Sequence, residues 1–251
     1  MVLTLLFLVA LLAGFVDSIA GGGGLITIPA LLWAGLGPVA TLATNKAQAV
    51  FGSGTAALNF IHKGEVDLRT VGPAVGCTFL GAAAGAWLIR HLDSAILGRL
   101  IPLLLIGFAI YFMASPRVDQ GVSDLDRRQR LGATTFAITA ALVIGFYDGF
   151  FGPGTGTFFA MAYVALLGYN LRRATAHSKL LNFTSNLAAL LVFLPAGQIE
   201  WPVAAVMATG QWLGAWLGSH LVLRHGSALI RPVLVVSSLL ISARLLLDQF
   251  A

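Results

Sequence analysis

The sequence predicts an all-α polytopic membrane protein made of two homologous halves, and three observations predict it. The chain is 58% hydrophobic and only 10% charged, with a mean hydropathy of +0.89, whereas roughly a quarter of the residues in a soluble domain are charged. Its apolar residues gather in segments of a length suited to membrane spans. A pattern of glycines, an aspartate and a lysine in the first part of the chain occurs again in the second.

Ten apolar segments are predicted, five in each half. The first half has segments at about 1–20, 24–36, 40–61, 70–90 and 96–114, and the second at about 131–151, 156–169, 174–194, 202–223 and 228–248. A full helical span needs about 20 residues. The second segment of each half is shorter than this, so it is either a short crossing or a re-entrant half-helix.

The first and second segments of each half are joined by a glycine-rich stretch that follows an aspartate. The stretch reads GFVDSIAGGGG over residues 14–24 and GFYDGFFGPG over residues 145–154. Glycine favours neither helix nor strand, and backbone that leaves a helix at membrane depth is tolerated only where protein or a water-filled cavity surrounds it. Both segments are therefore predicted to be broken at these glycines, within the protein.

The two stretches belong to a repeat that covers most of the chain. They lie 131 residues apart, as do Gly37 and Gly168. After a two-residue insertion the spacing becomes 133, which pairs Lys46 with Lys179, Gly81 with Gly214, and Gly85 with Gly218. Because an aspartate, a lysine and several glycines recur in the same order, we expect a first transmembrane repeat at 1–114, a linker at 115–130 and a second repeat at 131–251.

The basic residues of the loops indicate how the halves are inserted. Four crossings per half would divide these residues almost evenly between the two sides of the membrane. Five crossings per half place most of them on one side: Lys63, Arg69, Arg117, Arg127, Arg128, Arg130, Arg172, Arg173, Arg224 and Arg231. Since short cytoplasmic loops carry an excess of lysine and arginine, we expect inverted repeats, a cytoplasmic linker and both termini outside.

Polar residues gather near the start of the third segment of each half, around Lys46 and Lys179. A single lysine there could extend its ammonium group to the membrane interface. Two lysines at matching repeat positions, each among amide and hydroxyl groups, indicate a substrate site instead, because intramembrane charge is usually retained for function. A lysine surrounded by neutral donors suits an oxyanion.

The glycine turns supply the second part of the predicted site. Helices that restart after such a turn offer unpaired backbone N–H groups and the positive end of a helix dipole, both of which favour an anion. In secondary transporters built from inverted repeats the site lies between the halves, at broken helices. The predicted substrate-binding residues are Lys46, Lys179, Asn45, Thr44, His177, Ser178, Asn182, Gly22, Gly23, Gly154 and Thr155.

Asp17 and Asp148 are open to three interpretations. Each could accept hydrogen bonds from the glycine turn that follows it, pair with one of the lysines, or carry a proton during transport. The histidines, the single Cys77 and the carboxylates show no metal-ligand spacing. No metal and no cofactor are therefore expected. Nucleic acid is not expected as a partner either, because the basic residues lie in short loops.

At these residues the sequence resembles the TauE/SafE sulfite exporter family, within the toluene sulfonate uptake permease superfamily. The resemblance is carried by residues 14–23 followed by Pro29, by residues 43–46, and by their repeats at 145–154 and 176–179, and it covers almost the whole chain. It implies a bacterial or archaeal inner-membrane carrier of small anions, often sulfur oxyanions or organosulfonates, with proton coupling. Topologies drawn for the family usually have seven to nine spans, fewer than the ten segments expected here.

We therefore expect a non-enzymatic secondary transporter that exports a small anion, such as sulfite or sulfoacetate, by alternating access. Its partners would be this anion and the lipid bilayer, and small-residue faces at Gly81 and Gly85 would allow close helix packing within the chain or in a homodimer. A passive anion channel is the alternative. An intramembrane serine hydrolase using Ser53 or Ser178 is disfavoured, because His177 and Ser178 are adjacent and point about 100° apart on a helix.

Overall fold

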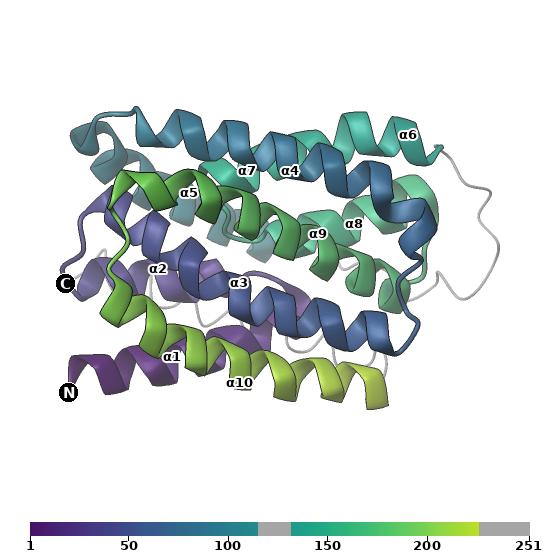
Figure 1. Ribbon diagram of the computed structural model, residues 1–251, viewed down its shortest axis with the longest axis horizontal. Coiled ribbons are helices and arrows are strands. Elements are labelled where there is room, and N and C mark those ends of the chain that lie inside the picture. The colour runs from purple at the N-terminus through teal and green to yellow at the C-terminus, as the bar shows by residue number, and fades with distance from the viewer. Residues whose placement is uncertain (115–131, 226–251) are drawn as a thin grey trace.

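The computed structural model describes residues 1–114 and 132–225, and every regular element in these ranges is a helix (Figure 1). The first half contains α1 (Val2–Ala20), α2 (Gly23–Trp33), α3 (Pro38–His62), α4 (Leu68–Arg90) and α5 (Ser94–Ala114). The second half contains α6 (Ala133–Phe136), the π-helical turn η1 (Ala137–Ala141), α7 (Leu142–Phe150), α8 (Thr155–Leu167), α9 (Leu171–Phe193), the 3₁₀ turn η2 (Leu194–Ala196) and α10 (Trp201–His225). The all-α fold class is confirmed.

The predicted segments that fall in the described ranges are all present, with ends that differ by a few residues. The segment expected at 131–151 is one helical stretch in which the π-helical turn η1 stands between α6 and α7. The linker at 115–130 and the segment expected at 228–248 lie outside the described residues. Four helical stretches of the described ranges are long and apolar enough to cross a membrane: Val2–Ala20, Leu68–Arg90, Ala133–Phe150 and Leu171–Ala196.

Helix α2 turns back along α1, so the short second segment forms an antiparallel hairpin with the first. Gly23 at the start of α2 lies against Asp17, and Leu31 near its end packs in one cluster with Leu6 of α1. The reversal takes place at Gly21 and Gly22, whose φ values are 87° and 95°. Only glycine adopts this region without strain, which is why the glycine run stands at this point of the sequence.

The two halves pack through two equivalent contacts, in each of which the first helix of one half lies on the fourth helix of the other. Helix α1 of the first half lies on α10 of the second, and α7 lies on α4 in the same way. At both contacts the small residues meet backbone directly: Gly81 and Gly85 lie against Leu142 and Phe146, and Gly214 and Gly218 lie against Leu11 and Phe15. These contacts are related by the repeat spacing. The small-residue faces therefore serve close packing within the chain.

Helices α3 and α9 pack against each other between these two outer pairs. Both carry buried polar side chains, among them Gln48 on α3 and Asn186 on α9. The polar residues of α3 are buried in the protein, so these positions need not be apolar. They lower the hydropathy of α3, which is why this helix is absent from the four spans named above. The polar interior of the bundle is thus supplied mainly by the third helix of each half.

Among the loop residues that the charge pattern assigned to one side, those within the described ranges gather at one end of the bundle. Arg172 at the start of α9 pairs with Glu65 of the α3–α4 connection at 2.5 Å, and Arg173 lies 4.0 Å from Asp67 of the same connection. In Figure 1 this connection is at the right, whereas the α9–α10 connection is at the left. The count of five segments per half stays a prediction, because the segment expected at 228–248 lies outside the described residues. The inverted orientation of the halves in a membrane stays a prediction.

Thr157 offers a test of how strongly the two glycine turns hold the halves together. Its hydroxyl donates a 2.8 Å hydrogen bond to the carbonyl of Ala20, the last residue of α1. Thr157→Val keeps the shape of the side chain but leaves that buried carbonyl without its donor, so we expect the free energy of unfolding to fall by about 1–2 kcal/mol in SDS titrations. Thr209→Val is the control, because Thr209 is exposed and bonds only within its own helix. Equal losses in both variants would contradict this role.

Candidate functional site

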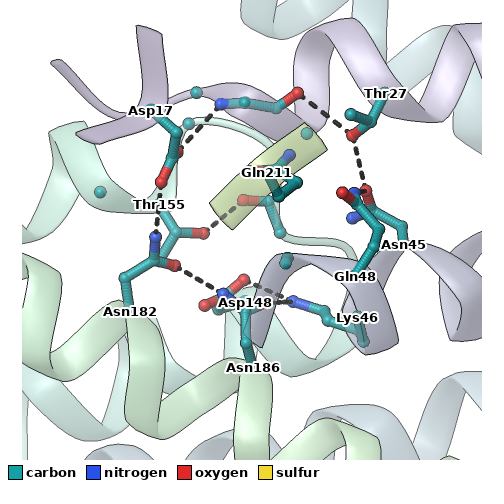
Figure 2. A pocket seen from close by; sticks show the side chains of 17 residues that line it. Asp17, Thr27, Asn45, Lys46, Gln48, Asp148, Thr155, Asn182, Asn186 and Gln211 are labelled. Carbon is teal, nitrogen blue, oxygen red and sulfur yellow. Dashed lines mark hydrogen bonds and ion pairs between the residues drawn. The ribbon is translucent and has the colours of Figure 1, made fainter. Parts of the chain in front are cut away.

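A cavity lies between the two halves (Figure 2). Its empty volume is about 390 Å³ when the adjoining open solvent is included. Its wall is formed by the ends of α1 and α7 with the glycine turns that follow them, by the starts of α2 and α8, by α3 and α9, and by one residue of α10. The residues predicted from the sequence that line it are Asp17, Gly22, Gly23, Asn45, Lys46, Asp148, Gly154, Thr155 and Asn182. The structure thus brings the glycine turns and the polar parts of the third helices to one place.

The first charged pair of the site joins α3 to α7. The ammonium nitrogen of Lys46 lies 2.6 Å from the Oδ1 atom of Asp148, and both side chains are 2% exposed. Lys46 also donates to the Oδ1 atom of Asn186 at 3.2 Å, and the Ser185 hydroxyl donates to Asp148 Oδ2. Each charge therefore has an opposite charge and a neutral hydrogen-bond partner, as a buried ion pair requires.

The second charged pair joins α9 to the end of α1 and is looser. The ammonium nitrogen of Lys179 lies 3.8 Å from Asp17 Oδ2 and donates to the backbone carbonyl of Asp17. The Asp17 carboxylate also accepts the N–H of Gly23 at 3.0 Å and the amide of Asn182 at 3.4 Å. Lys179 is 1% exposed but Asp17 is 16% exposed. Asp17 is thus both an acceptor for its glycine turn and an ion-pair partner.

The two pairs are equivalent in the repeat, and each crosses between the halves. Lys46 of the first half meets Asp148 of the second, and Lys179 of the second meets Asp17 of the first. Two ammonium groups and two carboxylates cancel, so these four side chains carry no net formal charge. Any anion that bound to one of these lysines would have to compete with a carboxylate for it.

The two glycine turns lie against each other at the cavity. Gly22 and Gly154 precede α2 and α8 in left-handed backbone conformations, with φ values of 95° and 82°. A side chain on Gly21 would collide with the backbone at Gly156 and Thr157, so glycine is also required here by close approach. Both helices therefore start at the cavity, where their positive dipole ends favour negative charge.

Four of the predicted residues do not line the cavity. Lys179 lies behind Asp17, which it contacts. Thr44 accepts a hydrogen bond from the backbone N–H of Glu200 at 3.1 Å, and the His177 ring accepts one from the backbone N–H of Asp67 at 3.2 Å. The Ser178 hydroxyl donates within α9 to the carbonyl of Thr175, and that of Ser53 within α3 to the carbonyl of Ala49. The bonds of Thr44 and His177 therefore join different elements of the bundle, whereas those of Ser178 and Ser53 stay within one helix.

Several polar residues line the cavity that the predicted set did not include. Thr27 and Gln48 both bond to Asn45 Oδ1, at 2.6 Å and 2.8 Å. Asn186 and Gln211 also face it (Figure 2). Gln211 lies directly against Gly14 and Gly52, where any side chain would collide with it. The one sequence signal for Gln211 is an uncharged amide inside an otherwise apolar segment. Within the described residues, no cluster of histidine, cysteine and carboxylate groups could hold a metal ion.

A bundle of membrane-spanning helices with two broken segments, and a polar cavity between its halves, has the architecture of a membrane transporter. Residues 6–245 match the family described as sulfite exporter TauE/SafE, and the chain belongs to this family. It is 47% identical over 249 residues to the probable membrane transporter protein YfcA of Escherichia coli strain K12, covering 99% of this chain and 91% of that protein.

Two further relatives carry similar names. A probable membrane transporter protein of Haemophilus influenzae is 47% identical over 247 residues, covering 98% of this chain and 95% of that protein. The probable membrane transporter protein ORF9 of Sinorhizobium sp. is 45% identical over 246 residues, covering 98% of this chain and 93% of that protein. No solved structure matches. The protein is a membrane transporter of the TauE/SafE family.

Proposed function

We propose that the protein is a secondary transporter that moves a small anion, of the class of sulfur oxyanions and organosulfonates, by alternating access with a coupled proton. The observation that carries the proposal is the pair of Lys–Asp contacts that cross between the halves beside the cavity. The name of the matching family supports a sulfur oxyanion as the substrate.

The ion pairs give a physical reason for proton coupling. An anion that binds Lys46 must displace the Asp148 carboxylate from its ammonium group, which lies 2.6 Å away. A displaced carboxylate would remain buried without a counter-charge, which costs several kcal/mol. Taking up a proton removes this cost, so Asp148 becomes neutral when the anion binds. The loaded site then holds the anion and one additional proton.

The same contacts support alternating access. Each pair ties a lysine of one half to an aspartate of the other, so the halves cannot rock apart at that point while the pair is intact. When the anion binds Lys46 and the proton binds Asp148, this ion pair between the halves is broken. The loaded carrier can then change conformation. Because anion and proton cross together, the step is electroneutral. Transport then follows their combined gradients, and a cell that accumulates the anion exports it.

Binding of methanesulfonate to the purified protein tests the proposal, because this anion does not itself titrate between pH 5 and 8. We expect its Kd to fall about tenfold for each unit by which the pH is lowered, the linkage slope for one proton. In Asp148→Asn the neutral amide replaces the protonated acid, and the slope should vanish. Asp93→Asn is the control, since Asp93 is exposed and caps α5. A Kd that is independent of pH in the unsubstituted protein would overturn proton coupling through Asp148.

Proteoliposomes separate a carrier from a passive channel. A pH gradient of one unit, acidic outside, should drive accumulation of the anion to about tenfold above its outside concentration, since one proton accompanies each anion. A membrane potential alone should drive no accumulation, because the step is electroneutral. Accumulation that follows the potential and ignores the pH gradient would identify a channel.

A further inference from the structure

Two hydrogen bonds join the two halves, one at each end of the bundle, and they occupy corresponding positions of the two repeats. The backbone N–H of Asp67 donates to His177 Nε2 at 3.2 Å, which we call the histidine latch. The backbone N–H of Glu200 donates to Thr44 Oγ1 at 3.1 Å, which we call the threonine latch. Asp67 and Glu200 are 133 residues apart, as are Thr44 and His177. The sequence therefore places different side chains, a histidine and a threonine, at one structural position.

Each latch joins the two halves just outside the site. The donors, Asp67 and Glu200, immediately precede α4 and α10, whereas the acceptors lie on α9 and α3 of the opposite half. Thr44 and His177 stand two residues before Lys46 and Lys179. The histidine latch is at the end of the bundle that carries the α3–α4 connection, and the threonine latch is at the other end (Figure 1).

The hydrogen bonds of His177 define its protonation state in the closed latch. Its Nδ1 atom lies 2.8 Å from the carbonyl oxygen of Arg173, which can only accept, so Nδ1 carries a hydrogen. Nε2 accepts from Asp67 and therefore carries none. The closed latch needs the neutral ring. A protonated ring has hydrogens on both nitrogens and cannot accept the N–H of Asp67.

We infer that Thr44 and His177 are gating residues for the two ends of the transport path, and that acid opens the His177 end but not the Thr44 end. The inference rests on the alternating access proposed above. A threonine hydroxyl does not titrate between pH 5 and 8, so the threonine latch has no such response. The two ends of one symmetric architecture thus differ in their control by pH.

The other groups around the His177 ring do not change charge between pH 5 and 8. Tyr163 of α8 and Tyr169 of the α8–α9 connection pack on the ring at centroid distances of 5.2 Å and 5.0 Å. The guanidinium of Arg173 lies over the Tyr169 ring and 4.0 Å from Asp67 Oδ2. Tyrosine and arginine have ordinary pKa values well above this range. The backbone N–H of Arg69 donates to the Asp67 carboxylate and lowers its pKa, so Asp67 stays ionised.

Spin-label distances in nanodiscs test the inference without any substrate. In a Cys77→Ala background, one label pair at positions 63 and 165 reports on the histidine latch. A second pair at positions 34 and 196 holds the equivalent repeat positions and reports on the threonine latch. In the first pair, long distances report the open latch and short distances the closed one. Lowering the pH from 8 to 5.5 should raise the ratio of open to closed molecules about tenfold, the change expected when the closed state loses one buried hydrogen bond. The second pair should show no such increase.

Exchanging the latch residues supplies the decisive variants. His177→Thr, which copies the other half, should abolish the pH response of the first pair, and Thr44→His should create a response in the second. If His177→Thr fails to fold, His177→Asn serves instead, because its amide oxygen accepts a hydrogen bond but does not titrate. A first pair with the same distances at both pH values, or a response that persists without His177, would overturn the inference. Failure of methanesulfonate binding alone would overturn only the proposed substrate.

Discussion

Lys46→Ala is expected to abolish methanesulfonate binding and to lower the free energy of unfolding by about 3–5 kcal/mol, because it leaves the buried Asp148 carboxylate without its counter-charge. Asp148 is 2% exposed, so water cannot replace the ammonium group 2.6 Å away. Unfolding in SDS measures the stability, and isothermal titration at pH 5.5 measures the binding.

Two further variants separate the structural loss from the functional one. The double variant Lys46→Ala/Asp148→Leu removes both charges, so stability should largely return while binding stays absent. Lys179→Ala should cost less than Lys46→Ala, because Asp17 is 16% exposed and keeps its bonds from Gly23 and Asn182. Methanesulfonate binding that survives in the double variant would remove Lys46 from the site.

Gly85→Ala is expected to lower the stability by about 3 kcal/mol or more, because the added methyl group would overlap the backbone of α7. Its Cβ would collide with the Phe146 carbonyl oxygen and would lie 2.7 Å from the Phe150 nitrogen. Two packed backbones cannot yield as a flexible side chain can. The measurements are the yield of monodisperse protein on size exclusion and its midpoint of unfolding.

Gly76→Ala is the matched control on the same helix. No atom lies within 4 Å of the position of its added Cβ, and replacing a helical glycine by alanine stabilises a helix by up to about 1 kcal/mol. Gly76→Ala should therefore be neutral or stabilising. Equal damage from both substitutions would show that the cost comes from the helix α4 itself and not from its contact with α7.

The fold was largely predictable because its signals are local. Long apolar segments and interrupting glycines appear directly in the sequence, and the helices follow them closely. The antiparallel course of α2 was not predictable, since an 11-residue helix can either return along α1 or continue away from it. The positive φ values of Gly21 and Gly22 decide this, and a glycine run permits both courses.

The site was predictable in its repeated residues and less so in its neighbours. Asp17 and Lys46 stood out because their types recur at equivalent positions, but their partners lie in the opposite half of the chain. Thr44 is close to Lys46 in sequence and yet faces away from the cavity. Residues two apart on a helix point to different sides, so a polar run could not show which members share a face.

The crossing of the ion pairs also has a consequence for biosynthesis. Lys46 and Asp148 are 102 residues apart, and a ribosome adds about 5–20 residues per second. Lys46 is therefore added to the chain roughly 5–20 s before Asp148 is. During that interval Lys46 of α3 has no counter-charge. It must therefore stay within the translocon or at the membrane surface. The buried ion pair between α3 and α7 can thus form only after α7 has been synthesised.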